Sequence, residues 1–465
     1  MAATSRAITE GMRRRRPRAV GMLAAAVVLV AITYVSAALQ PRASTSSRAT
    51  LLGDAATVTA PVGAVVGSAS SSVGQIDRAI EAWSANIAAE PADFLSATNL
   101  AMLYHGRGQL TGSLDNHERA LAAVRTALAT APTHAPARAL EAAIRLTLHD
   151  FSGALAAAEA LYQDDPTQLG ALATKADAEL ELGLMASARR DLVVLAAQAA
   201  GPAIDVRLAR LAFLTGKPDE ALRLARSARD AARAEAAASG GIDAGFYEFV
   251  AGEYARLTGD GAAARVGYEA ALTIRPTDLG AMVGLARIDA YDGRLQAAVE
   301  GLQAAAAIAP QPETLALLGD LLRATDNITD ADAAHDTVRF IERLGSLQGV
   351  VYDRQLLRFG LDHSGSATAI HEAARASLAA RSDPAGHDLV AWALYRLGRY
   401  DEAAVEIVAA RADGADDARL RFHDGAIALS RGDRRSGLAL LESALAMGPA
   451  LDSIERAEAQ RLIGS

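Results

Sequence analysis

The sequence predicts an all-α protein built as a right-handed solenoid of about ten helix-turn-helix units, and two observations carry that prediction. The first is composition. Alanine is abundant and only 4% of the 465 residues are aromatic, which favours helices that pack closely at small residues. The second is a recurrence of proline after 34 residues, from Pro132 to Pro166 and again from Pro276 to Pro310. A chain of this length exceeds one compact core, whereas stacked units need to pack only on their neighbours.

Residues 245–276 show the pattern of a single unit. Gly252 on the first expected helix and Ala264 on the second are small residues, placed where two helices would cross. Gly259 stands in the turn between them, where a left-handed backbone is easiest without a Cβ atom. Pro276 closes the unit because proline cannot continue a helix.

This pattern resembles the tetratricopeptide repeat (TPR), whose period is also 34 residues. The best match is the run LGRYDEA at 397–403. The resemblance covers about 80% of the chain, and it implies a fold and a protein-binding role without naming a partner. The arginine-rich, lysine-poor composition resembles that of proteins from GC-rich bacterial genomes. Units are expected to begin near Phe94, Ala135, Leu169, Pro202, Gly245, Leu279, Pro312, Val350, Pro384 and Ala418.

The chain ahead of the repeats predicts a membrane-crossing or exported protein. Arg13–Arg16 precede an uncharged stretch of about 20 residues, long enough to cross a bilayer as a helix. Positive flanks stay in the cytoplasm, so the bulk of the chain is expected outside it. A cleavable signal peptide is the alternative, since small residues around Ala37 suit a cleavage site. Cleavage would leave the chain secreted or periplasmic rather than anchored in the cell membrane by a single span.

The domain boundaries follow from these patterns and from the capping that a solenoid requires at each end. The Val350 unit is the weakest match, and an insertion at 231–241 is expected to lengthen one helix. We expect a basic cytoplasmic segment at 1–19, a transmembrane helix or signal peptide at 20–39, a flexible linker at 40–73, an N-terminal capping half-repeat at 74–93, the TPR solenoid at 94–451 and a charged C-terminal capping helix at 452–465.

No catalytic, cofactor or metal motif stands out. The chain has no cysteine, which excludes disulfides and thiolate chemistry. Its nine histidines are scattered, with no HExxH pattern or ligand triplet in the sequence. The net charge of −9 argues against nucleic acid as a partner. We therefore expect a protein that is not an enzyme and has no cofactor.

The concave groove of a TPR array is lined by residues of the first helices, and this is where the resemblance places a protein or peptide ligand. Arginines and aromatic residues commonly form binding hot spots. About one arginine per unit is expected there, and Glu253, Asp320 and Asp388 could neutralise that row. The residues that hold the C-terminal carboxylate of heat-shock proteins in TPR co-chaperones are absent. The densest group of arginine and aromatic residues, and our candidate groove, is Arg354, Arg358, Trp392, Tyr395, Arg396 and Phe422.

The expected function is a non-catalytic interaction scaffold or adaptor displayed outside the cytoplasmic membrane. The alternative is a periplasmic or cell-envelope accessory factor that positions glycan or lipid machinery. The repeat fixes the fold and leaves both functions open.

Overall fold

The computed structural model describes residues 73–239, 243–347, 354–363 and 365–464. The all-α prediction is confirmed for this part of the chain, which contains helices and no strand. The predicted segments at 1–19, 20–39 and 40–73 fall outside these ranges, apart from Val73. Within them no helix has the length and apolar character needed to cross a membrane.

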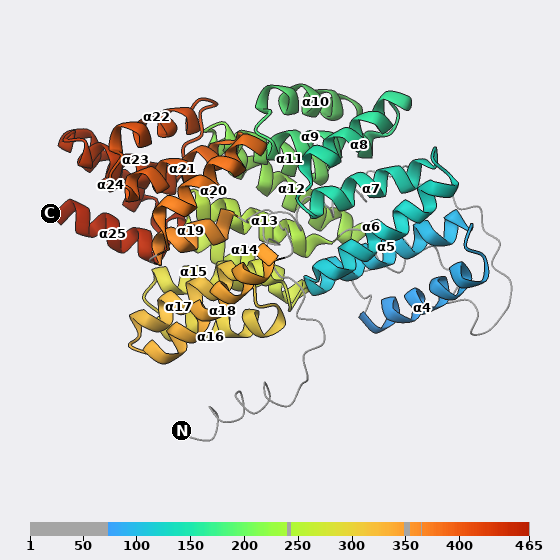
Figure 1. Cartoon of the computed structure of the whole chain (residues 1–465), viewed down its shortest axis with the longest axis horizontal. Helices are drawn as coiled ribbons and strands as arrows, with labels where there is room; N and C mark the ends of the chain where they lie inside the picture. The colour runs from blue at the N-terminus through green and yellow to red at the C-terminus, as the bar shows by residue number, and fades with distance from the viewer. Residues whose placement is uncertain (1–72, 240–242, 348–353, 364, 465) are drawn as a thin grey trace, which may run out of the picture.

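The described residues form ten helix pairs between two terminal helices (Figure 1). The first helices of the pairs are α5 (Phe94–Thr111), α7 (Ala135–Thr147), α9 (Leu169–Glu181), α11 (Pro202–Leu214), α13 (Ala244–Leu257), α15 (Leu279–Tyr291), α17 (Pro312–Ala324), α19 (Arg354–Asp362), α21 (Pro384–Arg396) and α23 (Ala418–Ser430). The second helices are α6 (Leu114–Thr130), α8 (Phe151–Asp164), α10 (Met185–Gln198), α12 (Pro218–Ser239), α14 (Gly261–Ile274), α16 (Leu295–Ile308), α18 (Ile328–Leu347), α20 (Ala367–Ala380), α22 (Tyr400–Ala410) and α24 (Arg434–Ala446). Helix α4 (Val73–Ala89) precedes the pairs, and a short 3-10 helix (Gly448–Ala450) and α25 (Ser453–Gly464) follow them.

The first helices begin where the repeat spacing places them. Nine of the ten start at the expected residue or one residue before it, and α19 starts at Arg354. Aspartate caps help to fix these starts: Asp278, Asp383 and Asp417 each accept a hydrogen bond from a backbone N–H of the first turn. Such caps satisfy donors that have no partner within the helix.

The helices of a pair cross closely because small residues meet there. A Cβ atom on Gly267 of α14 would lie 2.7 Å from the Cα atom of Gly252 on α13. The sequence predicted Ala264 as the facing residue. Its carbonyl oxygen is indeed near, 3.1 Å from a Cβ placed on Gly252, but Gly267 permits the closest approach. Next to this crossing, Tyr268 is fully buried and donates a hydrogen bond to Glu253 at 2.5 Å.

The array returns on itself, which the repeat alone does not predict. Figure 1 shows the orange and red helices of the C-terminal units beside the green helices of the central units. The turn at Gly183 faces the backbone of Ser382, and the turn at Gly216 faces Gly414. One unit further on, the turn at Gly259 faces Met447. Turns of three consecutive units therefore contact loops of three later units, and we call this set of contacts the interlock.

Charged groups reinforce the interlock. Arg256 of α13 donates to the carbonyl oxygen of Pro449 at 3.0 Å. Arg287 of α15 binds Asp452 at 3.1 Å, and Arg419 of α23 binds the same carboxylate at 3.2 Å. Burial alone would raise the pKa of Asp452, but the surrounding arginines hold it well below its usual value. The Arg256 contact joins residues 193 positions apart in the chain, and the contact between Arg287 and Asp452 joins residues 165 positions apart.

The sequence predicted a charged C-terminal capping helix that faces solvent, but several of the charged side chains in this segment are buried or paired. Glu455 is only 7% exposed, and its carboxylate pairs with Arg419. Arg456 lies over the ring of Tyr291, with 4.6 Å between the guanidinium carbon and the ring centroid. Charged residues that looked suited to solvent instead contact other units: Asp452 and Arg456 reach the central helix α15, and Glu455 pairs with Arg419 of the adjacent α23.

Candidate partner-binding surface

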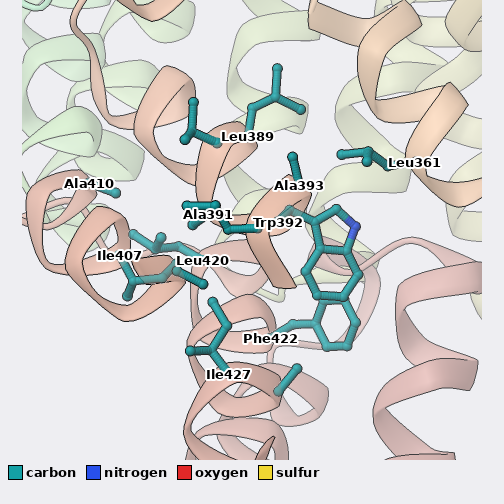
Figure 2. Packing of buried hydrophobic residues seen from close by; sticks show 14 of the residues in the cluster. Leu361, Leu389, Ala391, Trp392, Ala393, Ile407, Ala410, Leu420, Phe422 and Ile427 are labelled. Atoms are coloured by element: carbon teal, nitrogen blue, oxygen red, sulfur yellow. The ribbon is translucent and has the colours of Figure 1, made fainter. Parts of the chain in front are cut away.

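The six predicted groove residues come from three neighbouring first helices. Arg354 and Arg358 lie on α19, Trp392, Tyr395 and Arg396 on α21, and Phe422 on α23. Their aromatic members do cluster: the Trp392 ring stacks on Tyr395 at 4.6 Å between centroids and lies 5.3 Å from Phe422. Figure 2 shows Trp392 beside Phe422, with aliphatic residues of the same core around them.

Trp392 and Phe422 belong to the core rather than to an exposed groove. Trp392 is 2% exposed and Phe422 is fully buried. The indole of Trp392 stacks on His423 at 4.1 Å and donates a hydrogen bond to Asp362 at 3.2 Å. Trp392, predicted as a groove residue, is thus not accessible to a ligand. The space over the indole is taken by the next first helix, since successive α21 and α23 pack directly on each other.

The groove arginines bind carboxylates of the chain itself. Arg354 pairs with Asp383, and burial lowers the pKa of its guanidinium. Arg358 reaches Asp388 at 3.7 Å, and His423 holds the other oxygen of that carboxylate at 2.6 Å. The wider row of arginines is paired likewise: Arg210 with Glu181, Arg256 with Glu253, Arg287 with Glu313 and Asp452, and Arg323 with Asp332.

Arg396 is the most accessible of the six residues. Its side chain is 33% exposed, and its only ion pair in the described part of the chain is a long one, 3.7 Å to Glu458. The guanidinium lies 5.8 Å from the centroid of the Trp392 ring, within the range of a cation–π contact. Tyr395, next to it, is half-buried. These two residues therefore form an exposed edge at the end of α21, where both contact the Trp392 ring.

The structure also assembles a group of side chains that the sequence did not reveal. Asp320 of α17, His335 of α18 and His363, which directly follows α19, offer ligand atoms that all lie within 4.8 Å of one another. The sequence predicts that Asp320 neutralises groove arginines, and its histidines are scattered along the chain. Asp320 binds the two histidines instead. Spacing could not show this, because the three residues come from three successive helices.

Comparison with known proteins found similarity to solved structures only. Neither the family models nor the curated proteins gave a match. A tetratricopeptide repeat protein from Parabacteroides merdae ATCC 43184 is 18% identical, over 51% of this chain and 88% of its own, with a TM-score of 0.40. Yeast Tom70 is 12% identical, over 84% of this chain and 92% of its own, with a TM-score of 0.33. PilW, a type IV pilus biogenesis factor, is 18% identical, over 48% of this chain and 96% of its own, with a TM-score of 0.36.

These identities and TM-scores are too low to transfer a partner or an activity. The description of the fold rests instead on the chain's own features, namely the 34-residue period and the small residues at the helix crossings. The ten helix pairs that the structure describes are those that the 34-residue period of the sequence predicts.

Proposed function

We propose that this chain is a non-catalytic scaffold that binds a protein or peptide ligand, and that the exposed edge formed by Tyr395 and Arg396 is part of its binding surface. The observation that supports this proposal is the state of Arg396. Its guanidinium is exposed, weakly paired and held over an aromatic ring. A pre-oriented arginine loses little side-chain freedom on binding, and its planar donors suit a carboxylate. The ligand should therefore present an acidic group.

The binding surface is smaller than the predicted groove. Arg354, Trp392 and Phe422 stabilise the array itself, since their side chains are buried among residues of neighbouring helices. Arg358 is half-buried at the side of the same helices and contributes at most a charge near the edge. We therefore assign direct ligand contact to Tyr395 and Arg396 only.

A photo-crosslinking residue placed at position 395 of the full chain tests the contact directly. We expect it to crosslink one defined protein, whereas the same residue at the exposed position 435 should not. Arg396→Glu should then weaken binding of that protein at least about tenfold, as expected for an anchor residue, while Arg435→Glu leaves it unchanged. Equal affinities of the two variants would refute the role of the α21 edge.

We further propose that the array lies outside the cytoplasmic membrane, anchored by residues 20–39 or released after cleavage. The arginine run before that uncharged stretch supports this location. A reporter fused after residue 465 should be active in a version that works only outside the cytoplasm. Activity of a cytoplasm-only reporter at the same position would contradict the proposed location.

A further inference from the structure

We propose that Asp320, His335 and His363 form a binding site for a late first-row divalent metal ion, with Zn²⁺ as the preferred occupant. Two imidazoles and one carboxylate are a donor set that zinc and other metals of this row use in proteins. The three side chains converge from α17, from α18 and from the residue after α19, so the ion would bind three successive helices together. This inference does not depend on the proposed scaffold function.

The distances suit an ion of this size. The Asp320 Oδ1 atom lies 3.2 Å from His335 Nε2 and 2.7 Å from His363 Nε2. Ligand atoms around a tetrahedral zinc ion, at bonds of about 2.0–2.1 Å, are separated by about 3.3 Å. The His335 pair already has that separation, and the His363 pair needs to open by only about half an ångström. The three protein ligands leave a fourth position for water.

The surrounding residues orient the ligands as a metal site requires. The Nδ1 atom of His363 lies 2.9 Å from the carbonyl oxygen of Phe359, so Nδ1 is the donor there, and Nε2, which faces Asp320, is the nitrogen that would bind a metal in place of a proton. The Phe359 ring also stacks on His363 at 4.3 Å and contacts His335 at 5.4 Å. Gly319 makes room for His335, because a Cβ atom there would overlap the imidazole.

The site is mostly buried, but two of its three side chains keep some exposure to solvent, through which an ion could enter. The His335 side chain is 4% exposed, and those of Asp320 and His363 are 13% and 14% exposed. An enclosed site of this kind strengthens binding, since the ligands are held together before the ion arrives and little water competes with them. Because α18 and α19 lie on either side of residues 348–353, an ion here would link the weakest repeat unit to its neighbour.

Titration calorimetry with zinc chloride tests the proposal on the full chain, without a polyhistidine tag and after removal of metals with a chelator. We expect one Zn²⁺ per chain. Asp320→Asn keeps the size of the side chain, and His363→Gln keeps its polarity; each should weaken binding by at least about 100-fold, since loss of outer partners alone costs 10–100-fold. His371→Gln on α20 is the matched control and should bind as the unaltered chain does.

Thermal unfolding followed by circular dichroism provides a second readout. Zinc should raise the unfolding temperature of the unaltered chain and of His371→Gln, because an ion that binds only the folded state stabilises it. It should leave Asp320→Asn unchanged, while the helical signal at low temperature shows that this variant is folded. Absence of saturable binding, or equal affinity across all four chains, would show that the cluster is only hydrogen-bonded and would overturn the proposal.

Discussion

The interlock makes a sharp prediction about two glycines in its turns. Gly183 and Gly216 have left-handed backbones, with φ of 79° and 71°, and a Cβ atom on either would overlap the carbonyl oxygen of Ser382 or of Gly414. Gly293 and Gly398 have nearly the same φ, 79° and 73°, but have no neighbour within 4 Å of such an atom. Comparing alanine substitutions in the two pairs therefore separates the effect of backbone strain on stability from the effect of steric overlap.

The expected losses of unfolding free energy follow from backbone strain and steric overlap. Alanine in a left-handed conformation costs about 1–2 kcal/mol, and this is the whole loss of unfolding free energy expected for Gly293→Ala and Gly398→Ala. Overpacking adds about 1–3 kcal/mol, so Gly183→Ala and Gly216→Ala should lose about 2–5 kcal/mol in total. Each interlock variant is thus expected to be less stable than the control that shares its φ.

Amide hydrogen exchange of the full chain locates the effect. Gly183→Ala should speed exchange in residues 381–387, about 200 positions away, and Gly216→Ala should do so in residues 411–417. Gly293→Ala and Gly398→Ala should leave both segments as they are, since their effects stay in their own turns. If a denaturant titration gives equal losses within each pair and exchange changes only beside each substitution, the array is not closed by these contacts.

Three further predictions concern the core and the charges. Asp452→Asn should cost about 2–3 kcal/mol, because arginines are left with fewer partners. The pKa of Asp452 is depressed in the folded chain, so its stabilising effect is complete above the unfolded value of about 3.9 and declines gradually as pH falls from there towards the much lower folded value. In a pH series of unfolding, the difference in stability between the two chains should begin to shrink below about pH 4. Trp392→Ala should cost about 3–5 kcal/mol as a core truncation, and retention of full stability in a urea titration would contradict its buried position. Ala403→Leu should cost about 1–3 kcal/mol through overpacking at a fully buried crossing, whereas Arg399→Ala, with its exposed ion pair, should change the unfolding midpoint little.

The features that the sequence predicted correctly are those that depend on residues close together in the sequence. The starts of the first helices follow from capping aspartates and from the period, and the turns follow from glycines such as Gly259, whose φ is 92°. These signals act within one unit, and each unit packs mainly on the next. The expected start near Val350 lies outside the described residues, and the structure describes α19 from Arg354.

The candidate site was harder to predict because it depends on contacts between units. Arginine and aromatic residues at first-helix positions look the same in sequence whether they face a ligand or another helix. The burial of Trp392 depends on His423 of the next unit, and one of the two carboxylates that bind Arg287, that of Asp452, lies 165 residues away. The Asp320 cluster combines both difficulties, since its residues come from α17, from α18 and from the end of α19, and His335 and His363 flank the least regular part of the repeat.

The interlock also bears on how this array could evolve. Repeat proteins usually change length by duplicating or deleting whole units, since each unit contacts only its neighbours. Here Gly183, Gly216 and Gly259 must meet Ser382, Gly414 and Met447 in step. One unit gained or lost between these two runs would move every later loop away from its turn. Relatives of this chain should therefore differ in unit number ahead of Gly183, where the added length leaves that alignment intact.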